Sequence, residues 1–257
     1  MQSRLSILAL VMVFFIGSAL SPCLAATADS IGTIVPHIAQ GAAFTTEFQI
    51  MNLENNSQPF TLNFYDPQGQ ALFIPMQDSQ GQSLGVMRTM QGILSPGGSY
   101  FTKTAPGGLL QTGYAELLIA KTKAVAIITI FTQSIPGRPD FQASIPIIDK
   151  SQGQLRVPFK NTGGLTTTLA WANANLIGQE VLMIARDGNG VELCRLSKAL
   201  DARYQDSFVL SDRLACTANK NGLLEVQASG PGIAAIAFLF NDSGAFTTQL
   251  PLTLCCF

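Results

Sequence analysis

The chain has 257 residues, of which 47% are hydrophobic and 12% are charged, and its formal net charge at pH 7 is −1. This composition supplies enough apolar side chains for a compact core. A net charge so close to zero gives no electrostatic attraction for nucleic acid or for an anionic membrane surface, so we exclude nucleic acid as a partner.

Residues 1–28 have the order of a secretory signal peptide. Arg4 gives a positive start, residues 5–20 form an apolar run, and small residues suited to signal peptidase surround the expected cleavage site within 25–29. We therefore expect a secreted, periplasmic or cell-surface protein whose mature chain has no transmembrane helix. A lipid anchor at Cys23 is the alternative. We favour it less because a proline precedes this cysteine, where bacterial lipoproteins have Gly or Ala.

The pattern of the first half of the mature chain predicts β-strands. Residues 44–53 and 60–64 alternate between apolar and polar side chains, which is typical of half-buried strands. The Asp-Pro-Gln-Gly sequence at 66–69 separates two apolar runs and predicts a hairpin. Residues 114–120 and 124–131 are more continuously apolar, as in central strands that are covered on both faces.

The second half repeats the first. Residues 44–69 return at 165–190 with a constant offset of 121, and later landmarks return with smaller offsets. A repeat unit of this length indicates a duplicated domain. With about seven short strands expected in each copy, we predict an all-β fold of two tandem immunoglobulin-like β-sandwich domains. The predicted domains are 34–148 and 155–254, joined by a linker at 149–154.

The first copy is longer in two places, by 12 residues within 77–98 and by 4 residues within 134–140. Loops on a rigid sandwich often carry recognition, although many simply tolerate insertion. Two pairs of opposite charges lie in turn-rich segments, where they could bind a ligand or tie a loop by an ion pair. These candidate binding residues are Arg138 and Asp140 in the first copy and Asp212 and Arg213 in the second.

Cysteines are concentrated in the second copy, at Cys194, Cys216, Cys255 and Cys256. Four cysteines in an exported chain allow three full pairings. We favour a disulfide between Cys194 and Cys216, because the adjacent Cys255 and Cys256 can pair with each other only in a strained ring. No Cys-x-x-Cys pair accompanies the single histidine, so we expect no metal site and no cofactor.

The only histidine and the only tryptophan both have apolar counterparts in the other copy. His37 aligns with Phe159, and Trp171 aligns with Ile50. A position that accepts an apolar residue is more often a packing position than a catalytic or sugar-stacking one. We therefore expect both side chains to pack in the interior, and we expect His37→Phe to fold with little loss of stability.

Four short segments resemble uncharacterised tandem β-sandwich modules of secreted bacterial surface proteins. The segments that carry the resemblance are 35–39, 62–69, 136–141 and 210–213. The resemblance extends over nearly all of residues 34–252 and implies a sandwich fold and an exported location. It implies no catalytic residues, because that family has none established. The second copy departs from the pattern by its cysteines.

The sequence favours an exported noncatalytic protein that is structural, adhesive or ligand-binding, with a surface glycan or another extracellular protein as its partner. No nucleophile motif and no metal-ligand cluster occurs with the single histidine. The alternative is a secreted hydrolase that acts on glycans. For that chemistry, carboxylates such as Glu47 and Glu116 could serve as an acid and base pair.

Overall fold

The structure is a computed structural model that describes residues 31–119, 124–149 and 153–253. The predicted signal peptide lies outside these residues, as do Cys23, Cys255 and Cys256. Strands dominate the described chain, and they form four antiparallel sheets. The all-β fold expected from the sequence is therefore confirmed.

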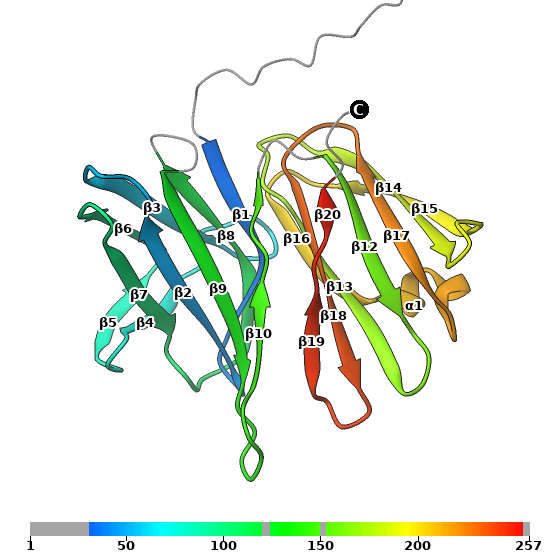
Figure 1. Cartoon of the computed structure of the whole chain (residues 1–257), viewed down its shortest axis with the longest axis horizontal. Helices are drawn as coiled ribbons and strands as arrows, with labels where there is room; N and C mark the ends of the chain where they lie inside the picture. Colours follow the sequence, from blue (N-terminus) through cyan, green and yellow to red (C-terminus); the bar gives the residue numbers. More distant parts are fainter. Residues whose placement is uncertain (1–30, 120–123, 150–152, 254–257) are drawn as a thin grey trace, which may run out of the picture.

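Two of the sheets come from the first half of the chain (Figure 1). Sheet A has the strand order β11–β1–β8–β3–β6, with β1 (Ile31–Gln40), β3 (Gln58–Tyr65), β6 (Thr89–Leu94), β8 (Gln111–Ile119) and β11 (Ile148–Asp149). Sheet B has the order β10–β9–β2–β7–β4–β5, with β2 (Phe44–Asn52), β4 (Ile74–Asp78), β5 (Ser83–Met87), β7 (Ser99–Thr104), β9 (Val125–Gln133) and β10 (Phe141–Ile145). Alternate residues of both sheets bury their side chains in one apolar cluster, so the two sheets pair as a sandwich does.

The second half forms the other two sheets. Sheet C has the order β15–β14–β17–β12–β20, with β12 (Gln154–Lys160), β14 (Gln179–Asp187), β15 (Glu192–Leu200), β17 (Asn221–Ala228) and β20 (Leu252–Thr253). Sheet D has the order β16–β13–β18–β19, with β13 (Leu165–Asn173), β16 (Tyr204–Val209), β18 (Ile233–Asn241) and β19 (Phe246–Gln249). A short helix, α1 (Leu210–Arg213), and a 3-10 turn, η1 (Ala215–Thr217), follow β16. Inward side chains of both sheets again share an apolar cluster.

One turn chemistry recurs four times. The side-chain oxygen of an Asp or Asn accepts hydrogen bonds from the backbone N–H groups two and four residues later, and the glycine three residues later has a positive φ. These turns begin at Asp66, Asp78, Asp187 and Asn241. Asp and Asn bond readily to nearby backbone, and glycine adopts positive φ without strain, so the local sequence fixes these turns. The last three close the hairpins β4–β5, β14–β15 and β18–β19.

The turn at Asp66 closes only a minimal hairpin, in which a single antiparallel bridge pairs Tyr65 with Ala71. After a single bridge between Tyr65 and Ala71, the chain leaves sheet A and enters sheet B as β4. The pairing goes no further because β6 and β8 occupy the two edges of the rest of β3. The longer stretch at 77–98 is not an open loop either, because half of it forms β5 and β6.

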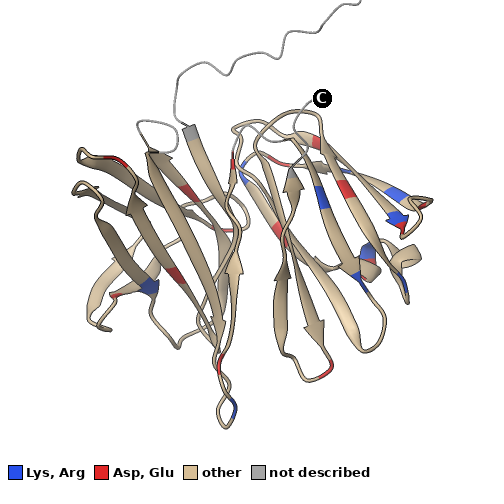
Figure 2. Cartoon of the chain, in the orientation of Figure 1, with Lys and Arg blue, Asp and Glu red and all other residues tan. Residues whose placement is uncertain are grey.

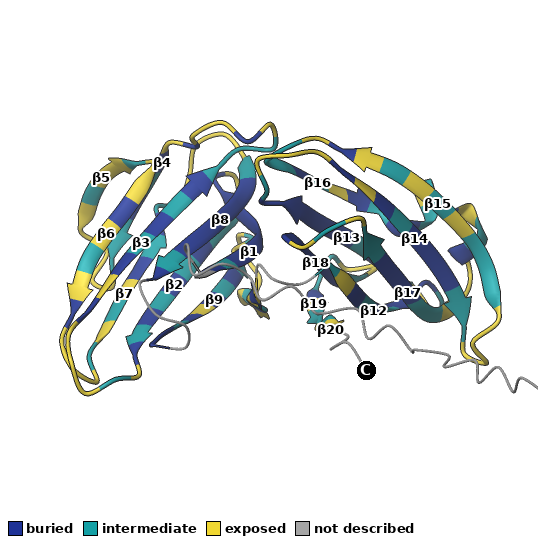
Figure 3. Cartoon of the chain, turned by 90° about the horizontal axis from the view of Figure 1, so that it is seen from above, coloured by how far each residue is buried: buried dark blue, intermediate teal, exposed yellow. Residues whose placement is uncertain are grey.

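Apolar packing continues between the two halves of the chain. β1 contacts β13 and β18, and β10 contacts β19. β1 is almost entirely buried because one of its faces is turned to each half (Figure 3). Ile34 of β1 belongs to the apolar cluster of the second half, whereas Phe238 of β18 belongs to that of the first half. The two halves therefore pack against each other through apolar side chains.

Polar contacts at one end of the interface fix its register. The backbone N–H of Gln205 donates to the carbonyl oxygen of Pro67 at 3.0 Å, and the Arg203 guanidinium lies 5.2 Å from the centroid of the Tyr65 ring. Gly69 lies so close to the second half that a Cβ there would be 2.1 Å from the carbonyl oxygen of Arg203. The turn that begins at Asp66 therefore forms part of the interface.

Cys194 of β15 and Cys216 of η1 form a disulfide, as the sequence predicted. The bond ties the edge strand of sheet C to the segment that follows α1. Disulfides persist in oxidising compartments such as the cell exterior and the bacterial periplasm. Among the described residues, no helix has the length and apolar character needed to cross a membrane.

Charged side chains gather in the second half, mainly on sheet C and near α1 (Figure 2). On the outer face of sheet C, the buried Glu225 carboxylate pairs with Arg156 at 3.0 Å and with Arg186 at 3.3 Å. The first half carries fewer charged residues than the second.

Candidate functional site

The predicted residues Arg138 and Asp140 lie in the connection from β9 to β10, but their side chains do different things. Arg138 Nη1 donates to the carbonyl oxygen of Ser243 at 2.6 Å, and its guanidinium lies 4.9 Å from the centroid of the Phe141 ring. Arg138 therefore ties the β9–β10 connection to the β18–β19 turn of the other half. Asp140 is exposed and lines a polar hollow on the first half.

Asp212 and Arg213 lie in α1, well separated from the β9–β10 connection (Figure 1). Arg213 Nη2 pairs with Asp206 at 2.7 Å, and its guanidinium lies 3.8 Å from the centroid of the Phe208 ring. These contacts give Arg213 a structural role in sheet D, while Asp212 is exposed. The four residues predicted as binding residues do not come together in one site.

The hollow that contains Asp140 lies on the outer face of sheet B and has a volume of about 240 Å³. We call it the sheet B pocket. Its polar lining residues are Thr45, Glu47, Gln77, Lys103, Thr132, Ser134, Asp140 and Gln142. The strand register brings them together, because Lys103 lies opposite both Glu47 and Gln77, and Thr132 lies opposite both Thr45 and Gln142. Directly opposed residues of antiparallel strands have Cβ atoms about 5 Å apart.

Most of these side chains keep their hydrogen-bonding capacity unused. Within the described part of the chain, the side chains of Gln77, Lys103, Asp140 and Gln142 make no hydrogen bond and no ion pair. Glu47 accepts one hydrogen bond, from Gln49 Nε2 at 2.7 Å. An ammonium group, a free carboxylate and two amides thus face one hollow and are available to a ligand.

An exposed aromatic ring lies on the same face of the sheet. Phe101 precedes Lys103 by two residues on β7, so both side chains point outward, and Phe101 is 42% exposed. Its cross-strand neighbour is Gln49, next to Glu47 on the outer face of β2. Phe101 does not line the pocket, but it offers an apolar surface beside it on the same face of sheet B.

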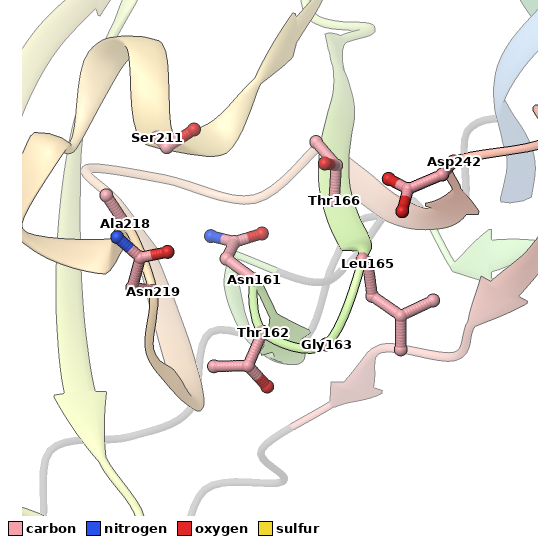
Figure 4. A pocket seen from close by; sticks show the side chains of 10 residues that line it. Asn161, Thr162, Gly163, Leu165, Thr166, Ser211, Ala218, Asn219 and Asp242 are labelled. Atoms are coloured by element: carbon pink, nitrogen blue, oxygen red, sulfur yellow. The ribbon is translucent and has the colours of Figure 1, made fainter.

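A second polar hollow, of about 270 Å³, lies between the β12–β13 turn, α1 and the β18–β19 turn (Figure 4). Its central side chain, Asn161, is already engaged: Nδ2 donates to the carbonyl oxygen of Thr217 at 3.1 Å, and Oδ1 accepts from the N–H of Thr167 at 2.7 Å. A Cβ at Gly164 would lie 2.5 Å from the Asp242 carboxylate. Asn161 thus holds neighbouring segments together, and the backbone at Gly164 packs too closely against Asp242 for any larger side chain. We therefore assign this hollow a structural role.

His37 lies in a third hollow, of about 200 Å³, between the two halves. Its ring packs edge-on against Phe131 at 5.7 Å and Phe238 at 5.5 Å, and Nδ1 accepts a hydrogen bond from Gln205 Nε2 at 3.3 Å. Burial lowers the pKa of His37 to about 4, so the ring is neutral at pH 7. The expected packing position is confirmed, but the sequence did not indicate that His37 also bonds to the other half.

Two other candidates are placed by the structure. Glu47 lies on the outer face of sheet B, whereas Glu116 is buried on β8 of sheet A, so the carboxylate pair considered for a hydrolase does not form. Trp171 is fully buried and its ring is T-shaped against Phe208 at 5.4 Å. As expected, Trp171 is a core residue and not a sugar-stacking platform.

Asp140 was the only residue of the sheet B pocket that the sequence singled out for binding. Lys103, Gln77 and Gln142 were missed because strand alternation shows which residues face outward but not which strands are neighbours. Among the described residues, no group of three or more His, Cys, Asp or Glu side chains is arranged to hold a metal ion. No family model matches the chain, and no curated protein is similar to it.

Proposed function

We propose that this chain is an exported, noncatalytic binding protein that holds a neutral saccharide in the sheet B pocket. The observation that carries the proposal is the set of polar side chains around one hollow that have no partner among the described residues: Gln77, Lys103, Asp140 and Gln142. Saccharide hydroxyls donate and accept hydrogen bonds. A carboxylate accepts from them, an ammonium group donates to them, and an amide does both.

The size of the pocket fits one sugar unit. Its volume of about 240 Å³ is that of about eight water molecules in the liquid, which is comparable to one pyranose ring with its hydroxyls. Phe101 offers an apolar face beside the polar groups, and the faces of pyranose rings that carry C–H groups pack on such rings. The combination suits a sugar better than a purely apolar or a purely ionic ligand.

The charge of the pocket selects among saccharides. Glu47 and Asp140 are acidic and Lys103 is basic, so the lining has a net charge of −1. An anionic sugar, such as a sulfated sugar or a uronic acid, would meet two carboxylates and is disfavoured. Neutral saccharides are therefore the proposed ligands.

The scaffold proposed for this function is a pair of immunoglobulin-like sandwiches that arose by duplication. Gly113 and Gly222 support it, since they occupy corresponding places: a Cβ at Gly113 would lie 2.0 Å from the carbonyl oxygen of Tyr65, and one at Gly222 would lie 1.9 Å from that of Arg186. Tyr65 and Arg186 are related by the same offset of 121 that relates the repeated segments. The disulfide between Cys194 and Cys216 supports the proposed export, to the cell exterior, the periplasm or the cell surface.

The test is an array of neutral and anionic glycans probed with the mature chain, followed by calorimetric titration of the strongest neutral ligand. Lys103→Ala and Asp140→Asn are each expected to weaken binding about tenfold or more, because a hydrogen bond to a charged group contributes about 1.5–3 kcal/mol. Lys220→Ala and Asp212→Asn change exposed residues of the second half and serve as matched controls with wild-type affinity. A protein that binds no glycan, or binds one equally well after both pocket changes, contradicts the proposal.

The alternative of a glycan hydrolase is measured with the same samples. The noncatalytic proposal predicts that reducing ends do not accumulate when the protein is incubated with a bound glycan. Release that is abolished by Glu47→Gln or Asp140→Asn would replace it with a hydrolase acting from the same pocket.

A further inference from the structure

The hollow around His37, which we call the interface pocket, is walled by aromatic rings from both halves of the chain. Phe131 of β9 stacks on Phe44 of β2 with 5.2 Å between ring centroids, and it contacts Phe238 of β18 at 5.5 Å. Phe240 lies 6.4 Å from Phe238 and continues the same wall. Aromatic walls at these spacings favour an aromatic guest, because ring pairs attract each other beyond simple burial of area.

The polar groups of the interface pocket are all uncharged. Within the described residues its lining contains no Asp, Glu, Lys or Arg, so a charged guest would lose its hydration without compensation. Thr112, Thr168 and Ser207 contribute hydroxyls. Because Nδ1 of the neutral His37 ring accepts from Gln205, the single ring proton is on Nε2. The pocket thus offers one N–H donor together with hydroxyls that donate and accept.

The size of the pocket limits the guest to one ring. Its volume of about 200 Å³ exceeds the roughly 150 Å³ of a cavity that holds benzene, and it lies below the roughly 300–1,000 Å³ of pockets for whole drug-sized ligands. Leu110 at the pocket is 52% exposed and the adjacent Leu109 is 88% exposed, so apolar surface continues outside it. A one-ring pocket beside exposed apolar side chains suits the anchor residue of a larger partner.

We propose that the interface pocket receives a tyrosine side chain of a partner polypeptide. The phenol ring packs against the phenylalanine walls, its oxygen accepts a hydrogen bond from His37 Nε2–H, and its O–H donates to a lining hydroxyl such as that of Ser207. A phenylalanine guest fills the same space but leaves the His37 donor unpaired. This site shares no lining residue with the sheet B pocket, so it stands or falls independently of the saccharide proposal.

The test uses the mature chain and a pentapeptide, Gly-Gly-Tyr-Gly-Gly, blocked at both ends, with binding measured by ligand-observed NMR. The same peptide with Phe or with Leu at its centre is the comparison. The Tyr peptide is expected to bind about three- to tenfold more tightly than the Phe peptide, because of the added hydrogen bonds, and the Leu peptide is expected to bind most weakly. Blocked tyrosine alone should bind no more tightly than the peptide.

Two changes at the pocket are matched by two controls outside it. Ser207→Phe fills the pocket from an exposed position, and Leu110→Asp places a charge beside it; each is expected to lower the affinity for the Tyr peptide at least about tenfold. Ser197→Phe on β15 and Leu109→Asp change exposed residues of the same types that do not line the pocket, and they should bind like wild type.

Three results would overturn the proposal: equal affinity for the three peptides, wild-type affinity in both pocket variants, or binding of blocked tyrosine without binding of the peptide. Saccharide binding by Ser207→Phe is measured in parallel. Its retention shows that the variant is folded and that the two sites are separate.

Discussion

The single histidine of the chain makes a clear prediction about how stability depends on pH. His37 is buried between the halves, and its pKa is lowered from the ordinary value of 6.5 to about 4 by loss of hydration, with no charged neighbour as a further cause. Below pH 6.5 the unfolded chain binds a proton that the folded chain does not bind. Stability is therefore full above pH 6.5 and is lost as the pH falls toward 4. With these two pKa values, the free energy of unfolding falls by about 2 kcal/mol between pH 7.5 and 5, and by about 3 kcal/mol by pH 4.

The assay is urea denaturation of the mature chain at several pH values between 7.5 and 5, where few carboxylates titrate. His37→Phe is expected to remove the pH dependence in this window. It should also lower stability at pH 7.5 by about 1–3 kcal/mol, because the Gln205 amide, in a residue only 2% exposed, loses its acceptor. This expected cost is larger than the small loss predicted from the sequence, because the hydrogen bond to Gln205 is visible only in the structure. His37→Gln keeps an acceptor for Gln205 and should be more stable than His37→Phe at pH 7.5, with the same flat profile. A wild-type protein whose stability is constant from pH 7.5 to 5 would refute the reasoning.

Three further changes test the scaffold. Cys194 and Cys216 are 22 residues apart, so reduction of their disulfide should lower the free energy of unfolding by about 3 kcal/mol by the chain-entropy relation. The measurement is the urea midpoint with and without reductant, and an unchanged midpoint would contradict the bond. Trp171→Ala should lower the free energy of unfolding by about 3–5 kcal/mol, and Trp171→Phe should lower it less. The buried indole N–H has no partner within the described residues, and phenylalanine removes that N–H while keeping a ring. Equal losses would contradict this packing. Gly69→Ala should lower the free energy of unfolding by at least about 1 kcal/mol, because φ is +75° and a Cβ would meet the Arg203 carbonyl. A thermal midpoint equal to that of wild type would show that the contact between the halves is absent.

The strands and several turns could be predicted because their causes are local. Period-two alternation at 44–53 follows from one buried face, and the Asp-Gly-Asn-Gly turn at 187–190 follows from side-chain bonds to the nearby backbone. The turn that begins at Asp66 has the same local hydrogen bonds, yet only a single antiparallel bridge follows it, without an extended hairpin. Whether a turn leads into a hairpin depends on which strand edges are free, and this is a property of the whole sheet rather than of the turn.

The sites were harder to predict for the same reason. Alternation along 44–53 separates inward from outward residues, and Glu47 faces outward, but its neighbours Lys103 and Gln77 come from strands that are distant in sequence and adjacent only in sheet B. The place of His37 between the halves depends on how the outer face of sheet D packs on β1. No periodic pattern within one strand contains that information. Only Asp140 was found, because a charged residue in an inserted turn is visible without the fold.

The most direct test of the proposed function is to map a bound saccharide onto the protein by NMR. Backbone amide shifts are followed while the strongest neutral glycan from the array is titrated into the mature chain. The proposed function predicts that the largest changes cluster at the sheet B pocket, at residues such as Thr45, Lys103, Thr132 and Gln142, and that the second half is unchanged. Changes confined to the second half, or no saturable changes at millimolar saccharide, would contradict it.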